Sequence, residues 1–187
     1  MKNIVILVSG SGTNLQRIID TIESGEIEDA KISLVVADRA CYGLERAKNH
    51  NIENMLIPRG KNFSAELGKM IPENTDLIVL AGFLSILKQE FCEKWSGKII
   101  NIHPALLPKF GGKGMWGMNV HHAVIAAKEK QSGATVHFVT SGIDEGAIIL
   151  QKSFEVTEND TPETLAEKVH HIEYEIFPIA INQVLGN

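Results

Sequence analysis

The sequence predicts an α/β fold, in which helices flank a mostly parallel, twisted sheet, with a late antiparallel strand and a long C-terminal helix. Three observations support this fold class. Short runs that are apolar throughout alternate with segments whose apolar residues recur at helical spacing. A glycine-rich turn separates the first apolar run from the first helical segment. The length of 187 residues is typical of one domain, so a single domain over residues 1–187 is expected.

Strands and helices alternate regularly over the first hundred residues. The apolar runs are rich in β-branched residues, which predicts buried parallel strands joined by right-handed crossovers. Strands are expected at residues 3–8, 32–37, 55–57, 76–81 and 98–102. Helices are expected at residues 15–20, 43–49, 63–71 and 86–95.

The pattern changes after residue 102. Residues 106–119 hold four glycines and a proline, which excludes one regular element over that length. A helix is expected at residues 120–130, followed by strands at 135–139 and 147–156. The connection between these last two strands is expected to be a loop.

The C-terminal helix has the clearest boundary signals. Thr161 is the expected N-cap, and Pro162 fits the first helical turn. Pro178 lacks the N–H group that a helix interior uses, so a kink is expected there. The apolar stripe of this helix comprises Leu165, Val169, Ile172, Ile176 and Phe177.

The composition favours a protein that acts on small molecules in a reducing cytoplasm. Lys and Arg number 18 against 23 Asp and Glu, and the formal charge of −5 disfavours a nucleic-acid-binding protein. The longest nearly unbroken apolar stretch, residues 77–84, is too short to span a membrane, and no signal peptide is expected. Cys41 and Cys92 lie far apart without a CxxC motif, so neither a disulfide framework nor a zinc knuckle is expected.

The loop at residues 10–14 (GSGTN) is the first candidate site. Glycines let the backbone approach an anion, and a helix N-terminus offers free N–H groups and a positive dipole end. Ligands of open α/β sheets bind at the carboxyl ends of strands, which favours phosphate binding here. A dinucleotide fingerprint would need glycine in place of Leu15, although Asp38 could accept from a ribose. The alternative is a tight turn capped by Thr13 or Asn14.

The second candidate is the pair Asn101 and His103, at the end of the strand expected at residues 98–102. Their two-residue spacing places both side chains on one face of an extended chain. An amide donor and a protonated imidazole suit a reaction in which negative charge develops on oxygen. A purely structural histidine is the alternative.

Asp144 is the third candidate, in the loop expected between the last two strands. A carboxylate near His103 would favour the charged imidazolium and orient it, although the spacing alone favours an ordinary acidic turn. A metal site is not expected, because His121–His122 and His170–His171 are adjacent pairs that point different ways on a helix.

Six motifs, taken together and in this order, resemble the phosphoribosylglycinamide formyltransferases, a family that uses 10-formyltetrahydrofolate. The resemblance runs from residue 3 to about residue 178, and the NIHPALLP segment is shared with the wider group of 10-formyltetrahydrofolate-dependent transferases. The motifs are residues 10–16 (GSGTNLQ), 79–83 (VLAGF), 101–108 (NIHPALLP), 133–137 (GATVH), 144–146 (DEG) and 149–151 (ILQ).

The resemblance implies a Rossmann-like formyltransferase fold and a direct transfer of the formyl group to the amine of 5-phosphoribosylglycinamide, a step of purine biosynthesis. It implies a phosphate-binding half at about residues 1–100 and a catalytic, folate-binding half at about 101–187. The implied catalytic residues are Asn101, His103 and Asp144. The implied substrate-binding residues are Gly12, Thr13, Asn14, His170 and Glu173. The folate site is expected at Leu84, Ser85, Ile86, Leu87, Asn101, Val139 and Thr140.

Three positions depart from the family pattern. Ser85 stands where many relatives carry arginine, and His170 where some carry glutamine. The stretch between Ile57 and Asp76 is short, and Arg59 or Lys61 is the expected substitute for a basic residue that binds the folate tail.

The expected partners are therefore the two small substrates, 5-phosphoribosylglycinamide and 10-formyltetrahydrofolate as co-substrate. No metal, nucleic acid or membrane is expected, and the protein is expected to be a monomer or a homodimer. Two alternatives stay open at this point. One is a nucleotide-binding module without catalysis, and the other is a different formyltetrahydrofolate-dependent transferase, although initiator-tRNA formyltransferase and formyltetrahydrofolate hydrolase are expected to need additional domains.

Overall fold

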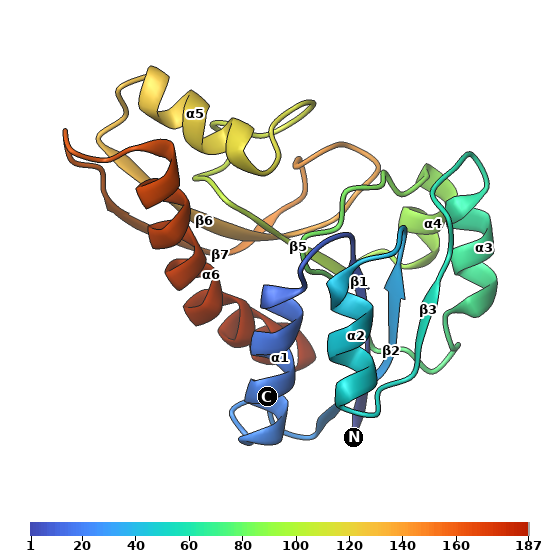
Figure 1. Cartoon of the computed structure of the whole chain (residues 1–187). Helices are drawn as coiled ribbons and strands as arrows, with labels where there is room; N and C mark the ends of the chain where they lie inside the picture. Colours follow the sequence, from blue (N-terminus) through green and yellow to red (C-terminus); the bar gives the residue numbers. More distant parts are fainter. Residues whose placement is uncertain (187) are drawn as a thin grey trace.

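Seven strands form one sheet in the order β3-β2-β1-β4-β5-β6-β7 (Figure 1). The computed structural model describes residues 1–186. Strands β1 to β5 pair in parallel, and β6 pairs antiparallel with both β5 and β7. This arrangement confirms the expected mostly parallel sheet with a late antiparallel strand. The strands are β1 (Lys2–Val8), β2 (Ala30–Ala37), β3 (Asn54–Leu56), β4 (Leu77–Leu80), β5 (Ile99–His103), β6 (Gln131–Phe138) and β7 (Ile148–Glu155).

Six helices cover the sheet. α1, α2 and α6 pack on one face, whereas α3 and α4 pack on the other. α5 packs against the start of α6 through a small separate core. Among residues 1–186, no helix has both the length and the apolar character to cross a membrane. The helices are α1 (Thr13–Glu23), α2 (Tyr42–Asn49), α3 (Phe63–Met70), α4 (Gln89–Lys94), α5 (Met118–Ala126) and α6 (Pro162–Leu185).

The apolar runs form strands because both faces of the sheet are buried. Ile4 and Ile6 of β1 belong to the core beneath α1, α2 and α6, whereas Val5 and Leu7 belong to the core beneath α3 and α4. β5 follows the same alternation, with Ile100 and Ile102 in the first core and Ile99 in the second. Asn101 therefore projects from the same face of the sheet as Ile99.

Several expected helices have different limits. The helix expected at residues 15–20 extends over Thr13–Glu23. α4 begins at Gln89 instead of residue 86, because the N–H groups of Leu84 and Lys88 donate to the hydroxyls of Ser9 and Ser64, and Lys88 is extended. α5 covers Met118–Ala126 instead of residues 120–130. It ends early because Lys128 has a φ of 52°, in the left-handed region.

β6 begins at Gln131, four residues before the expected start at residue 135. Gly133 reads as a strand breaker in the sequence, but here it permits a close strand pair. A Cβ atom at this position would lie 2.0 Å from the carbonyl oxygen of Lys152 on β7.

The long helix α6 begins as expected and continues through its internal proline. Thr161 is the N-cap, and it exchanges side-chain hydrogen bonds with Thr164 in a capping box. Pro178 has no N–H group for the carbonyl oxygen of Tyr174 one turn earlier. Arg17 on α1 supplies the missing bond, because its Nε donates to that oxygen at 3.1 Å.

This bond predicts a coupled effect on stability. Arg17→Met should lower the free energy of unfolding by about 1 kcal/mol, because a helix carbonyl loses its donor. The loss should be smaller in a Pro178→Ala background, where residue 178 regains an N–H group within the helix. Urea unfolding of the two single variants and the double variant measures the difference, and an equal loss in both backgrounds would contradict this account.

Candidate active site

The N-terminus of α1 lies directly after β1 and carries no side-chain cap. Gly12 is the N-cap residue with a φ of 71°, and among residues 1–186 no side chain caps the start of α1. The alternative of a turn capped by Thr13 or Asn14 is therefore wrong, since the Asn14 side chain bonds elsewhere. A Cβ atom at Gly12 would lie 2.8 Å from the Cα of Gly43, so the loop packs closely on α2. The first-turn N–H groups of α1 are thus left without a side-chain acceptor.

Asn14 joins the start of α1 to the middle of α6. Its Nδ2 donates to Oε2 of Glu173 at 3.0 Å, and its Oδ1 is buried without a partner in the described structure. The Nε2 of His170 lies 3.9 Å from the same carboxylate oxygen. The structure therefore brings together the substrate-binding residues that the sequence predicts from both ends of the chain.

Glu173 is a buried carboxyl group, with 5% of its surface exposed. Burial raises the pKa of Glu173 from 4.5 to about 7, and the hydrogen bond from Asn14 lowers it by a smaller amount. This group therefore exists in both protonation states near neutral pH.

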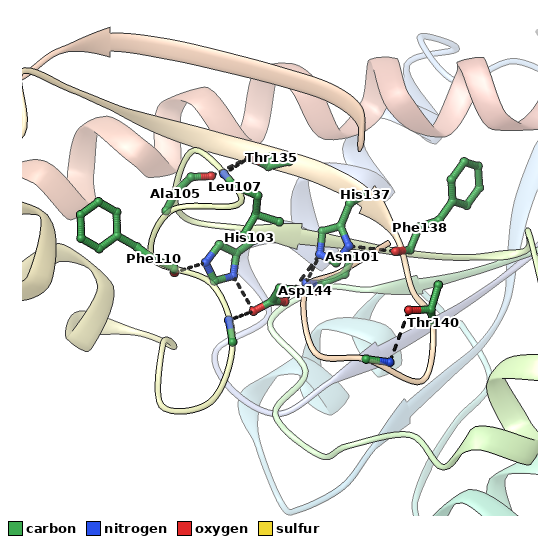
Figure 2. A network of polar contacts seen from close by, with 12 residues as sticks. Asn101, His103, Ala105, Leu107, Phe110, Thr135, His137, Phe138, Thr140 and Asp144 are labelled. Atoms are coloured by element: carbon green, nitrogen blue, oxygen red, sulfur yellow. Dashed lines mark hydrogen bonds and ion pairs between the residues drawn. The ribbon is translucent and has the colours of Figure 1, made fainter. Parts of the chain in front are cut away.

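Asn101, His103 and Asp144 meet on the face of β5 that carries Ile99 (Figure 2). Oδ2 of Asp144 lies 3.6 Å from Nδ1 of His103. The main chain of Asp144 has a φ of 57°, a conformation that is uncommon for a non-glycine residue. His103 is buried, and 12% of the Asp144 side chain is exposed. The expected proximity of the carboxylate to His103 is confirmed.

The glycine-rich segment after β5 fixes both of these groups from the main chain. Nε2 of His103 donates to the carbonyl oxygen of Phe110 at 2.7 Å, since a carbonyl can only accept. The N–H of Gly112 donates to Oδ2 of Asp144 at 2.9 Å. The Nδ1 atom of His103 is consequently the ring nitrogen that faces Asp144.

Thr135 on β6 holds the start of this segment in place. Its buried Oγ1 donates to the carbonyl oxygen of Ala105 at 2.6 Å and accepts from the N–H of Leu107 at 3.1 Å. Nε2 of Gln151 on β7 donates to the same hydroxyl at 2.8 Å and to the carbonyl oxygen of Leu107 at 3.1 Å. The main chain therefore leaves β5 along a fixed path toward Phe110.

Two histidines at the site were not among the sequence candidates. His137 on β6 lies next to Asn101 and Asp144, and burial, the largest effect, lowers its pKa. His121 on α5 is buried with no partner for Nδ1 in the described structure. Burial and the nearby His170, His122 and His103 lower the pKa of His121 to about 4. The sequence signals for His137 were its place on an expected strand and at the end of the GATVH motif at residues 133–137.

Asp38 does not offer a free acceptor for a ribose. Its side chain is fully buried at the end of β2, and its oxygens accept from Arg39, Arg59 and the hydroxyl of Ser85. Arg59 binds Asp38 at 2.9 Å, yet half of its side chain remains exposed. The dinucleotide hypothesis therefore loses the acidic residue on which it depended.

The two expected folate segments border the core beneath α3 and α4. Phe83, just before residues 84–87, and Val139 both pack against this core. Leu84 and Ile86 are exposed, whereas the Leu87 side chain is buried in the core and can offer only its main chain. Thr140 accepts from the N–H of Gly142 at 3.4 Å within the loop that carries Asp144 (Figure 2).

The described residues contain no group of three or more His, Cys, Asp or Glu side chains arranged to hold a metal ion. A shallow pocket does open beside Asp144, between Gly111–Gly112 and the connection from β6 to β7. The arrangement offers an amide, two imidazoles and one carboxylate near the end of β5, and the uncapped start of α1 lies at the end of β1. β1 and β5 are two strand spacings apart, roughly 10 Å. A small phosphorylated molecule can span that distance.

Comparisons with known proteins agree on one family. A family model described as formyl transferase matches residues 2–181. The phosphoribosylglycinamide formyltransferase of Haemophilus influenzae is 42% identical, over 97% of this chain and 86% of that protein. The trifunctional purine biosynthetic protein adenosine-3 of Bos taurus is 40% identical over 97% of this chain, which spans only 18% of that longer protein. The crystal structure of glycinamide ribonucleotide transformylase 1 from Symbiobacterium toebii superposes with a TM-score of 0.91 at 36% identity, over 100% of this chain and 88% of that one.

The raised pKa of Glu173 predicts a pH-dependent stability. Between pH 4.5 and about 7 the folded protein holds a proton on Glu173 that the unfolded chain has released. The stabilisation that this proton provides is therefore complete at low pH and is lost as the pH rises through about 7. The free energy of unfolding of the wild type, relative to Glu173→Gln, should therefore fall by on the order of 3 kcal/mol over this range.

Urea unfolding of both proteins at about pH 5 and about pH 8 measures this change. Glu167→Gln, on the exposed surface of the same helix, is the matched control and should leave the pH dependence of the wild type unchanged. A Glu173→Gln protein with the pH dependence of the wild type would show that Glu173 is ionised in the fold.

Proposed function

The chain belongs to the formyl transferase family, and we propose that it transfers the formyl group of 10-formyltetrahydrofolate to the amine of 5-phosphoribosylglycinamide. The products are formylglycinamide ribonucleotide and tetrahydrofolate, which makes the reaction a step of purine biosynthesis. The observation that carries the proposal is the meeting of Asn101, His103 and Asp144 beside the uncapped N-terminus of α1.

The transfer proceeds through a tetrahedral intermediate. The substrate amine attacks the formyl carbon, and a new C–N bond forms while the carbonyl oxygen takes the negative charge. The bond from the formyl carbon to N10 of the folate then breaks. The amine loses one proton and N10 gains one, so the proton count balances. An enzyme accelerates such a step chiefly by placing donors where the oxyanion forms.

Asn101 and His103 provide these donors. Nε2 of His103 is committed to the carbonyl oxygen of Phe110, so Nδ1 is the nitrogen that can carry a proton toward the reacting oxygen. Oδ2 of Asp144 lies 3.6 Å from that nitrogen and holds the ring in this orientation. Asp144 also orders the water through which the proton passes from the amine to N10.

The phosphate of the substrate binds at Gly12, Thr13 and Asn14. The positive φ of Gly12 turns the chain so that the first N–H groups of α1 point out of the helix without a competing side-chain cap. His170 adds a donor on the neighbouring helix, and Glu173 binds the ribose hydroxyls. The distance between β1 and β5 matches a ligand that carries a phosphate at one end and an amine at the other.

The folate lies against residues 84–87 and 139–140. The exposed Leu84 and Ile86 side chains offer an apolar surface to the pterin ring, and main-chain groups supply hydrogen bonds. Arg59, which Asp38 holds in place with half of its side chain exposed, supplies a positive charge for the acidic tail of the folate. Ser85 is committed to Asp38 and contributes through its main chain.

Both halves of the chain contribute to both sites in this proposal. Residues 84–87 of the first half contact the folate, and His170 and Glu173 of the second half contact the phosphorylated substrate. We assign the enzyme to the cytoplasm, as a monomer or homodimer. Its partners are the two small substrates.

The proposal predicts formyl transfer by the purified chain. Wild-type protein should convert 10-formyltetrahydrofolate and 5-phosphoribosylglycinamide to products. The absorbance of the folate product measures the reaction over time. Asp144→Asn and His103→Ala should each lower kcat by roughly 100-fold or more, because each removes a charge or a donor at the oxyanion. Their thermal unfolding should remain cooperative.

Asp20→Asn on the exposed part of α1 is the matched control and should retain full activity. Wild-type turnover in an Asp144→Asn protein would remove Asp144 from the catalytic group. A wild-type chain with no transfer activity would refute the proposed function as a whole.

A further inference from the structure

His137 lies against the catalytic group, on the strand that pairs with β5. It stands opposite Asn101 in the β5–β6 register, and its side chain is 2% exposed. Its Nε2 lies 3.1 Å from Nδ2 of Asn101 and 3.7 Å from Oδ1 of Asp144 (Figure 2). Its other ring nitrogen, Nδ1, lies 2.9 Å from the carbonyl oxygen of Phe138. Both ring nitrogens therefore have a polar partner.

These contacts define the state of the ring. A carbonyl oxygen only accepts hydrogen bonds, so the proton lies on Nδ1 and is donated to Phe138. Burial, the largest influence, lowers the pKa of His137, against smaller opposing effects of the Phe138 carbonyl and Asp144. Nearby His103 also lowers it. The neutral ring thus presents a lone pair on Nε2, which accepts a hydrogen bond from the Asn101 amide.

An acceptor at this position decides the orientation of the amide. The oxygen and nitrogen of an asparagine side chain are nearly equal in size, so only the chemistry of the neighbours distinguishes the two orientations. With Nδ2 toward His137, Oδ1 points away from the ring. The second hydrogen of Nδ2 then remains available to another acceptor.

The absence of a proton on Nε2 of His137 also matters for Asp144. A proton on Nε2 of His137 would attract Oδ1 of Asp144, which lies 3.7 Å away, and would compete with His103 for the carboxylate charge. A neutral ring leaves that charge to Nδ1 of His103. Of the two buried histidines near Asp144, His103 thus interacts with the carboxylate charge, whereas neutral His137 does not compete for it.

We propose that His137 is a positioning residue, which accepts a hydrogen bond from Asn101 and thereby fixes the amide as an oxyanion donor. The inference rests on the proposed formyl transfer, because it assigns to Asn101 a donor role in that reaction. His137 itself contacts neither substrate. Its effect on the rate passes through Asn101.

A double-mutant cycle tests this route. His137→Phe keeps a ring but removes the acceptor, and it should lower kcat by about 10- to 100-fold with KM for each substrate changed less than about threefold. His137→Gln should recover part of the loss, because its Oε1 can accept from Asn101. In an Asn101→Ala background, His137→Phe should lower kcat by less than about twofold. His171→Gln, on the exposed surface of α6, is the control and should retain the wild-type kcat.

A spectroscopic measurement tests the ring directly. In protein with ¹⁵N-labelled histidine, the ring resonances that disappear in His137→Gln belong to His137. At about pH 7 they should show a neutral ring with its proton on Nδ1. The ring state is read from the folded wild type, and His137→Gln serves only to assign the resonances.

The outcomes separate the two claims. Equal losses of kcat in the wild-type and Asn101→Ala backgrounds would overturn the inference while formyl transfer stands. An imidazolium or an Nε2–H ring would overturn it as well, since neither offers a lone pair to Asn101. Absence of transfer by the wild type would refute the proposed function, and the positioning role with it.

Discussion

The alternation of side chains along β5 is the constraint on which the site depends. Ile100 and Ile102 are buried beneath α1, α2 and α6, so Asn101 and His103 must project from the opposite face. A shift of one residue would turn the amide and the imidazole into the core beneath α1, α2 and α6, and would place two isoleucines at the site instead. The hydrophobic core therefore sets the register of the catalytic pair. The antiparallel pairing with β6 then places His137 directly opposite Asn101.

Main-chain groups, more than side chains, hold the remaining parts of the site. Phe110 and Gly112 contact His103 and Asp144 through the backbone, and Thr135 fixes the segment that leads to them. These bonds require main-chain conformations that are unfavourable for most residue types. Phe110 and Gly112 both have a positive φ, and a Cβ atom at Gly146 would lie 1.7 Å from the carbonyl oxygen of Phe138. The glycines around Asp144 are therefore part of the geometry of the carboxylate.

The sequence was most informative where local chemistry decides the structure. The apolar runs, the glycine turn before α1 and the cap at Thr161 were predictable because each depends on neighbouring residues. The start of α4 was not, because the hydroxyls of Ser9 and Ser64 come from distant elements. For the same reason the sequence did not predict that Asp38 binds Arg59 or that His137 accepts from Asn101. Those partners meet only through the strand order, which pairs β2 with β3 and β5 with β6.

The electrostatics of the site run against the charge of the whole molecule. The protein carries a formal charge of −5, yet both proposed substrates are anions. A fully ionised Glu173 beside the N-terminus of α1 would repel a phosphate. Burial reduces this repulsion by raising the pKa of Glu173 to about 7, so that near neutral pH a large share of the molecules hold a neutral carboxyl group. The neutral group both donates and accepts hydrogen bonds, which suits a ribose hydroxyl. Burial of His137 acts by the same principle, because it keeps a potential cation neutral where a lone pair is needed. In both cases loss of hydration selects the uncharged form, and the local hydrogen bonds then decide what that form can bind.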